Sequence, residues 1–199
     1  METKEFAGKT DEQLAGLTQQ GNVEAFGFLV KKYQDRMQRY IKRIIQGHEE
    51  ANDISQNVFL KAFENIQGFN TKQRFSPWIY RIAHNETVNY LRKKKPLLLF
   101  DFDVFLPHYN LGKDDIENEA EKKDLSQKIE RFLGELSLKQ KEVLLLYYFQ
   151  ELSYQEIADV LKIPIATVGV RIKRAKEAIK EIASAQGGFA SGGKIYANK

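Results

Sequence analysis

The amino-acid sequence predicts an all-α protein of two small helical domains joined by a flexible linker. Apolar residues recur at intervals of three and four, as on the buried face of a helix, and no sustained strand-like alternation occurs. Proline, glycine and capping residues divide the chain into helix-length segments. Residues 10–95 carry 14 basic and 9 acidic side chains, residues 96–122 carry 2 and 7, and residues 123–183 carry 11 and 9. Two basic domains are therefore expected on either side of an acidic linker.

Three helices are predicted at the start of the first domain. Thr10 and Gln13 have the spacing of a capping box, in which each side chain pairs with the other residue's backbone N–H, and this helix extends to about residue 20. A second helix runs from about residue 23 to 46 and a third from about residue 50 to 66. Their apolar spacing predicts a buried stripe made of Phe26, Leu29, Val30, Tyr33, Met37, Tyr40, Ile41, Ile44, Ile54, Val58, Phe59, Ala62 and Phe63.

A fourth helix and a linker complete the first half of the chain. Ser76 is suited to the N-cap and Pro77 to the first position of a helix that extends to about residue 94. Pro96 ends it. Residues 96–122 mix apolar and acidic side chains without a clear period. This linker either packs back onto a domain or binds a partner, and the sequence leaves both possibilities open.

The second domain is predicted to contain a helix-turn-helix. Ahead of it, one helix extends to about residue 134 and another begins at a capping box of Ser137 and Gln140. Ser153 and Glu156 form a third capping box at the start of a short helix, and Pro164 lies at the turn before a longer one. The longer helix has an apolar stripe, predicted to be buried, made of Ile165, Val168, Ile172, Ala175, Ile179 and Ile182.

The opposite side of that longer helix is polar and basic, with Thr167, Val170, Arg171, Lys173 and Arg174. A recognition helix that enters a DNA major groove needs an apolar face that packs on the protein core and a basic face that meets the DNA. On periodicity and charge alone, a solvated basic face that binds nothing is the alternative. The remaining tail, residues 184–199, is glycine-rich and expected to be disordered.

Composition excludes several kinds of protein. The chain has no cysteine, and its three histidines show no ligand spacing, so neither disulfides nor a metal or other cofactor is expected. No apolar segment reaches the roughly 20 residues that cross a bilayer, and the N-terminus lacks a signal-peptide core. A cytoplasmic protein without membrane insertion is expected. It is not expected to be an enzyme, because the sequence shows no nucleophile–base pair, phosphate-binding glycine loop or metal cluster.

Four segments in order resemble bacterial RNA polymerase sigma factors of the extracytoplasmic-function class (group IV, sigma-70 family). They are GNVEAFGFLVKKYQDRMQRY, EANDISQNVFLKAFENIQGF, RFSPWIYRIAHNETVNYLRKKK and LGELSLKQKEVLLLYYFQELSYQEIADVLKIPIATVGVRIKRAKEAI. The first three are similar to region 2 of the family, and the fourth to the whole of region 4. The resemblance covers about residues 10–183. It implies a factor that directs core polymerase to promoters and assists DNA melting.

The resemblance implies that a polar helix face binds the coiled coil of the polymerase's largest subunit. The candidates are Asp53, Gln56 and Asn57. The family's usual pattern is Asp-apolar-apolar-Gln-acid-x-Phe, so Ser55 replaces an apolar residue and Asn57 replaces the acid. One charge of the expected contact is therefore missing. A solvated face without a partner is the alternative.

The resemblance also places recognition of the −10 promoter element, as single-stranded DNA, in the loop 69–75 and the helix after it. Aromatic rings stack on unpaired bases, and cations contact phosphates. The candidates are Asn70, Thr71, Lys72, Arg74, Phe75, Trp78, Arg81, Arg92 and Lys93. Asn70 or a neighbour is expected to hold an extruded base. Core packing is the alternative for Phe75 and Trp78.

Region 4 is implied to read the −35 element as duplex DNA. The candidates are Ser153, Thr167, Val170, Arg171, Lys173 and Arg174. Arginine can contact guanine edges or phosphates, and a helix N-terminus suits a phosphate. Gly169-Val170 stands where a polar pair is usual, and Lys162 replaces the usual turn glycine. The bases that are read therefore do not transfer from the family.

The partners implied are core RNA polymerase, through its largest-subunit coiled coil and its flap region, and promoter DNA. An anti-sigma factor is a further candidate, and the free chain is expected to be a monomer. The main alternative is a conventional helix-turn-helix regulator whose first domain senses a signal or dimerises. A third possibility is an adaptor that binds polymerase without promoter DNA.

Overall fold

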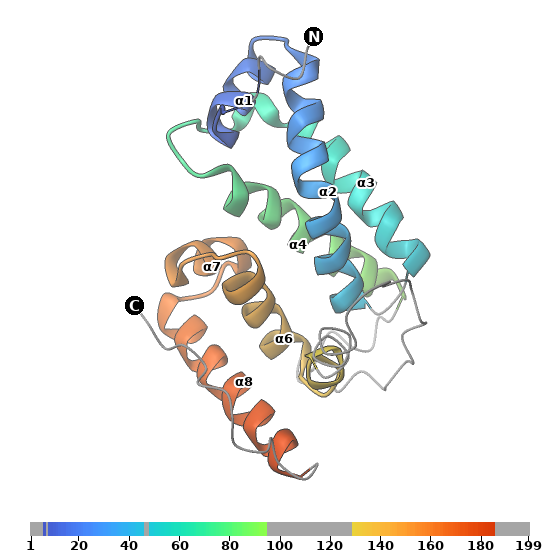
Figure 1. The fold of residues 1–199 in the computed structure, drawn as a ribbon, viewed down its shortest axis with the longest axis vertical. Coiled ribbons are helices and arrows are strands. Elements are labelled where there is room, and N and C mark those ends of the chain that lie inside the picture. Colours follow the sequence, from blue (N-terminus) through green and yellow to red (C-terminus); the bar gives the residue numbers. More distant parts are fainter. Residues whose placement is uncertain (1–5, 7, 46–47, 95–128, 186–199) are drawn as a thin grey trace.

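The computed structural model describes residue 6 and residues 8–45, 48–94 and 129–185 (Figure 1). Within these residues the chain forms helices and no strands, which confirms the predicted all-α class. The helices are α1 (Asp11–Gln19), α2 (Val23–Ile45), α3 (His48–Glu64), the 3₁₀ helix η2 (Ile66–Gly68), α4 (Phe75–Lys94), α6 (Leu138–Leu144), the π-helix η4 (Leu145–Phe149), α7 (Tyr154–Leu161) and α8 (Ile165–Ala185). Residues 129–134 are also helical. The linker prediction for 96–122 and nearly all of the predicted tail lie outside the described residues.

The first domain is built from α1 to α4 around the predicted apolar stripe. The capping box at α1 is confirmed: the Gln13 N–H donates to Thr10 Oγ1 at 3.3 Å, and the Thr10 N–H donates to Gln13 Oε1 at 2.9 Å. Almost all of the stripe is buried or packed against the core. Phe63 is the exception, since 41% of it is exposed although its ring lies 5.1 Å from that of Phe26. The prediction that Phe63 is buried is therefore wrong.

Helix α4 begins two residues earlier than predicted, at Phe75 instead of Pro77. Ser76 was expected to be the N-cap, but it lies inside the helix, which starts at Phe75. The first N–H groups of a helix have no partner within it. Here the Phe75 N–H donates to Glu12 Oε1 at 3.0 Å, so a side chain from α1 takes the role expected of Ser76.

The second domain contains the predicted helix-turn-helix, formed by α7 and α8. The capping boxes at Ser137 and Ser153 are both present. Val168, Ile172 and Ala175 of the predicted stripe are buried. Ile165 is 48% exposed, so its predicted burial is wrong. Ile165 is the first residue of α8, and Pro164 before it accepts the N–H of Thr167 at 2.9 Å. The stripe therefore reaches the core only from the first full turn onward.

The two domains contact each other. Helix α4 packs against α7, and α2 approaches α6. Figure 1 shows α4 lying between the rest of the first domain and the orange helices of the second. This arrangement places the loop before α4 beside the start of the helix-turn-helix.

Candidate nucleic-acid interface

The loop between η2 and α4 exposes a run of polar and basic side chains. Asn70, Thr71, Lys72 and Arg74 are all exposed. The Asn70 side-chain oxygen accepts the N–H of Lys72 at 3.0 Å, and its backbone carbonyl accepts the N–H of Gln73 at 2.9 Å. An asparagine that pairs with the backbone two residues later forms a compact turn. The turn leaves the side chains that follow Asn70 pointing outward as a polar, positively charged surface.

Helix α1 holds this loop in place. The Gln19 side-chain amide donates to the carbonyls of Ile66 at 2.8 Å and Phe69 at 2.7 Å, on either side of the turn into the loop. The Gln67 amide donates back to the Gln19 carbonyl at 2.9 Å. Thr71 of the loop lies beside Gly16 of α1, where an added Cβ would be in ordinary van der Waals contact, 3.6 Å from Thr71 Cγ2. The loop is therefore fixed before any ligand binds.

The aromatic residues beneath the loop divide into core and surface. Phe75 is fully buried, with its ring centroid 5.6 Å from that of Tyr33 and 5.4 Å from those of Phe69 and Trp78. A ring in that position cannot stack on a base, so the structure removes Phe75 from the expected contacts. Trp78 is only partly buried and keeps accessible surface.

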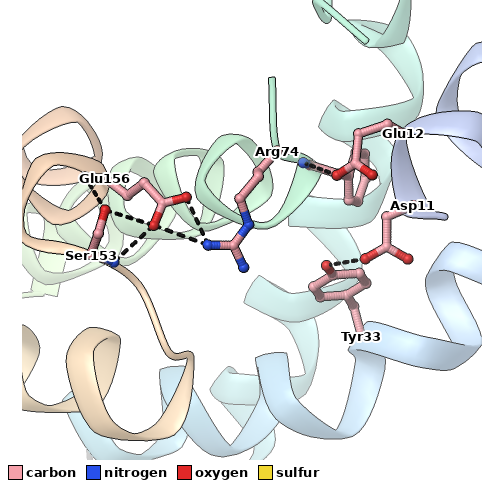
Figure 2. Close-up of polar contacts among 7 residues, drawn as sticks. Asp11, Glu12, Tyr33, Arg74, Ser153 and Glu156 are labelled. Carbon is pink, nitrogen blue, oxygen red and sulfur yellow. Dashed lines mark hydrogen bonds and ion pairs between the residues drawn. The ribbon is translucent and has the colours of Figure 1, made fainter. Parts of the chain in front are cut away.

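Tyr33, under the same cluster, is tied to α1. Its hydroxyl donates to Asp11 Oδ2 at 2.7 Å (Figure 2). Burial raises the pKa of Tyr33 well above its usual range, and the hydrogen bond to the Asp11 carboxylate raises it further. The hydroxyl therefore stays protonated and works as a structural tie rather than a titrating group.

The basic residues predicted on α4 are exposed. Arg92 and Lys93 lie in its last turn, and Arg81 lies one turn after Trp78. Arg81 is not free of contacts, since its Nε–H donates to the backbone carbonyl of Asp159 in α7 at 3.1 Å. Arg74, at the end of the loop, pairs with Glu156 of α7 at 2.8 Å. Two of the predicted −10 residues are thus held by the helix-turn-helix.

The three predicted polymerase-binding residues share one exposed face of α3. Asp53, Gln56 and Asn57 are exposed, whereas Ser55 is buried at 2% exposure, so it occupies the apolar position that it replaces. The same face continues into Leu60, which is 60% exposed. The sequence reasoning missed Leu60. Its position one turn after Gln56 and Asn57, outside the buried stripe, was the signal that could have identified it.

The recognition helix α8 shows most of the predicted division between its faces. Val170, Lys173 and Arg174 are exposed, Thr167 and Arg171 are partly buried, and Ser153 is exposed while its hydroxyl caps α7. Gly169 lies against Tyr154, whose ring carbon would be 3.6 Å from an added Cβ. That distance is an ordinary van der Waals contact, so the packing of Tyr154 does not require glycine at this position. Val170 itself is 48% exposed, on the same helix as the exposed basic residues Lys173 and Arg174.

The turn of the helix-turn-helix carries a backbone constraint. Lys162 caps α7 with φ 54° and ψ 48°, in the left-handed region that glycine adopts without strain. Its N–H donates to the Ala158 carbonyl, as the usual glycine would. The motif therefore keeps its geometry although a lysine occupies the turn.

The described part of the chain contains neither a candidate metal site nor a candidate membrane-spanning helix. No group of three His, Cys, Asp or Glu side chains there could hold a metal ion. No helix there is long and apolar enough to cross a membrane.

Comparisons with solved structures agree with the architecture. The chain of CnrH solved with the cytosolic domain of CnrY superposes with a TM-score of 0.66 at 23% identity, covering 89% of this chain and 99% of that one. The sigma factor RpoE of Bartonella quintana, solved with the anti-sigma factor NepR, gives a TM-score of 0.65 at 20% identity, covering 80% and 96%. At these identities the likeness concerns the fold.

Comparisons of sequence assign the family. The Sigma-70 region 2 family matches residues 29–96, and the Sigma-70 region 4 family matches residues 126–179. The chain is 34% identical to the ECF RNA polymerase sigma factor SigW of Bacillus subtilis, over 81% of this chain and 90% of that protein. It is 33% identical to the RNA polymerase sigma-H factor of Pseudomonas aeruginosa, over 85% and 91%. The chain therefore belongs to the sigma-70 family, as an RNA polymerase sigma factor of the extracytoplasmic-function class.

Proposed function

We propose that this sigma factor reads the −10 element as single-stranded DNA with the loop 70–74 and the adjoining side of α4. The observation that carries the proposal is that an exposed polar and basic loop is held rigidly by Gln19 and by Glu12. A surface fixed in advance binds without the entropic cost of ordering a mobile segment. The surface of Trp78 that remains accessible offers a stacking site, and Lys72, Arg74 and Arg81 offer phosphate contacts.

The polar part of the loop fits an extruded base. Asn70 uses its side-chain oxygen within the turn, and its amide nitrogen remains available as a donor. Thr71 lies next to it, exposed at the surface. Removing a base from the stack costs a few kcal/mol, which such donors and acceptors offset in part. Arg92 and Lys93 at the far end of α4 then contact phosphates of the flanking duplex.

The −35 element is proposed to lie in contact with α8. Arg171 and Arg174 supply guanidinium groups for guanine edges or phosphates. Thr167 and Lys173 contact the backbone, with Ser153 at the start of α7. Val170, which is 48% exposed, contributes methyl contacts where a hydrogen bond would be usual. Thymine methyl groups are the apolar feature of the major groove that suits such a side chain.

Core RNA polymerase is proposed to bind the α3 face of Asp53, Gln56 and Asn57, with Leu60 as an apolar addition. Region 4 would bind the flap region. Catalysis then belongs to the polymerase, and the chain acts beside it in the cytoplasm. Two similar structures were solved with CnrY and with the anti-sigma factor NepR. We infer that an anti-sigma factor is a candidate partner here as well.

Transcription in vitro tests the proposal. Core polymerase plus this chain is given a promoter library, and the initiated transcripts are sequenced. A defined pair of upstream elements should emerge. No initiation at any sequence, combined with sequence-specific duplex binding by the free chain, would instead favour the conventional helix-turn-helix regulator.

A further inference from the structure

The outward side of α2 carries a concentration of positive charge that none of the contacts proposed above uses. Residues 31–43 hold six basic side chains and a single acidic one, Asp35. Four of the basic residues recur at intervals of four, three and four, so they lie on one face of the helix. These four, which we call the α2 stripe, are Lys32, Arg36, Arg39 and Arg43. At 1.5 Å per residue the stripe is about 16 Å long.

The middle of the stripe is open to solvent. Arg36 and Arg39 are both exposed with the second domain in place. Neither forms an ion pair within the described part of the chain. At the far end, by contrast, Arg43 Nη2 lies 2.6 Å from a carboxylate oxygen of Glu130. Two adjacent guanidinium groups are therefore available to a ligand.

Positive charges at this spacing repel each other. Lys32 and Arg36 are four residues apart, as are Arg39 and Arg43, and like charges at that spacing destabilise a helix. A helix face that meets only water usually interleaves acids with bases, whereas Asp35 is the single acid among residues 31–43. A polyanion relieves the repulsion and releases the counterions that the stripe and the polyanion hold when separate. Nucleic acid is the ligand that this charge pattern favours.

The stripe begins beside the loop proposed to bind the −10 strand. Asp11 of α1 accepts a hydrogen bond from Lys32 Nζ at 2.6 Å and another from the Tyr33 hydroxyl at 2.7 Å (Figure 2). The Tyr33 ring centroid lies 5.6 Å from that of Phe75, the residue at which α4 begins after the loop. A strand that leaves the loop on this side therefore meets α2 next.

The middle of the stripe lies near α4. Helix α2 packs against α4 (Figure 1), and the ring centroids of Tyr40 and Tyr80 are 5.2 Å apart. Burial raises the pKa of Tyr80, and the positive charges of Arg36 and Arg39 oppose that rise. Both guanidinium groups are thus close enough to α4 to influence a group on it. The cations of α2 and the DNA contacts proposed for α4 belong to one continuous region of the first domain.

The contacts proposed above indicate which part of the strand reaches α2. Arg92 and Lys93, at the far end of α4, are assigned to the flanking duplex that leads to the −35 element, and the loop is assigned to the −10 element. The strand that continues past the loop is therefore the downstream one. We propose that Arg36 and Arg39 contact phosphates of the single strand immediately downstream of the −10 element. The proposal rests on the function proposed for the loop and α4, and it adds a second surface to that function.

The test uses the holoenzyme formed by core polymerase and the full-length chain. Two fluorescent single strands carry the −10 element of a promoter from which the chain initiates. One ends at the downstream edge of the element, and the other continues for several nucleotides of arbitrary sequence, because phosphate contacts do not read bases. The measured quantity is the gain in affinity that the extension provides.

The variant is Arg36→Gln with Arg39→Gln. Both side chains are exposed, so the free energy of unfolding should stay nearly unchanged, as urea unfolding can verify. Lys31→Gln with Lys180→Gln is the control, since it removes the same two charges at exposed positions outside the stripe. Arg36→Lys with Arg39→Lys keeps both charges and tests for rescue.

The extension should increase the affinity of the wild-type holoenzyme. In the glutamine variant that gain should fall by about three- to tenfold, while the affinity for the short strand stays the same. The slope of log affinity against log salt for the long strand should fall by about 1.4, since each phosphate contact to a single strand contributes about 0.7. The lysine variant should retain most of the gain, and the control should match the wild type.

Neutral phosphates identify the contact directly. An extension in which methylphosphonates replace the phosphates should lose the gain with the wild type. It should make no further difference with the glutamine variant, because both changes remove the same interaction. Equal gains in the wild type and the glutamine variant would overturn the proposal. Additive effects of the methylphosphonates and the arginine changes would overturn it as well.

Two further outcomes separate this proposal from others. If the glutamine variant co-purifies less with core polymerase in the absence of DNA, the stripe binds an acidic protein surface and the proposal is wrong. If no form binds either strand and the chain also fails to direct initiation, the function proposed for the loop fails too. If only the gain from the extension is unaffected by the arginine changes, short-strand binding and initiation persist, so the two failures are distinguishable.

Discussion

Glu12 in α1 accepts a hydrogen bond from the backbone N–H of Phe75, the first residue of α4, at 3.0 Å. The helix that follows the loop proposed to bind DNA is therefore capped by a side chain 63 residues earlier in the sequence. This contact, with those of Gln19, makes the position of the loop depend on α1. Helix α1 therefore helps to position the loop for which DNA binding is proposed.

Changing Glu12→Ala should destabilise the first domain by about 1 kcal/mol, the usual effect of removing an N-cap acceptor. It should also reduce promoter opening, because the loop is less firmly held. Urea unfolding measures the first effect, and permanganate reactivity of the −10 strand measures the second. Glu12→Gln keeps a side-chain oxygen in place and should resemble the wild type. Equal opening by Glu12→Ala would show that the cap does not position the loop.

Changing Arg171 and Arg174 to Ala should weaken binding to duplex DNA that carries the −35 element by at least tenfold, since each good contact contributes about 1–3 kcal/mol. The salt dependence of binding should fall as well, because fewer counterions are released. Polymerase binding should be unchanged. Fluorescence anisotropy and co-purification measure the two. Lys180→Ala, further along α8, is the control, and unaltered affinity in the double variant would contradict the assignment.

Changing Leu60→Ala should reduce co-purification with core polymerase, as should the double change Asp53→Ala with Gln56→Ala. Leu60 is 60% exposed, so its loss should leave the free energy of unfolding nearly unchanged. A loss of binding without a loss of stability separates a contact residue from a core residue. Lys31→Ala, on an exposed part of α2, serves as the control. Full retention of binding in both variants would place the polymerase contact elsewhere.

The contact between the domains should weaken as pH rises. Burial by itself lowers the pKa of His84, but the hydrogen bond and charge of Glu142 outweigh it and raise the pKa above the usual value of 6.5, against smaller opposing effects of Lys162 and Arg171. The Tyr40 hydroxyl also meets Glu142 and stays protonated. A raised pKa means that the closed form binds the proton more tightly. The stabilisation is complete below pH 6.5 and is lost as pH rises through the raised pKa.

The distance between spin labels on cysteines introduced at the exposed positions Lys31 in α2 and Lys180 in α8 should therefore lengthen as pH rises above about 6.5 in the wild-type chain. His84→Gln keeps a hydrogen-bonding side chain without this titration and should flatten the profile. An unchanged profile in His84→Gln would assign the pH dependence to another group.

Changing Lys162→Gly should stabilise the second domain. The left-handed backbone of Lys162, at φ 54°, strains a residue with a Cβ by roughly 1–2 kcal/mol, and the greater freedom of glycine in the unfolded chain offsets part of that gain. A net increase of about 0.5–1 kcal/mol in the free energy of unfolding is expected. Thermal unfolding measures it, with Lys162→Ala as the control that retains the strain. No difference between the two variants would show that the turn is not strained.

The sequence by itself determined the local elements of this protein. The capping boxes at Thr10, Ser137 and Ser153 join residues three positions apart, so they form from the sequence alone. The stripes of α2 and α3 were predicted because helical periodicity repeats every turn. The order of the four sigma-like segments made the family recognisable.

Only the tertiary structure decided which residues are accessible. For Phe75 the sequence left DNA stacking and core packing open, and it is fully buried because rings from other elements surround it. Ile165 and Phe63 are exposed because no element among the described residues covers them fully. The contacts of Glu12 with Phe75 and of Arg74 with Glu156 span 63 and 82 residues. Periodicity reports which side of a helix is apolar, but it carries no information about which distant element meets that side. That choice depends on the packing of the whole chain.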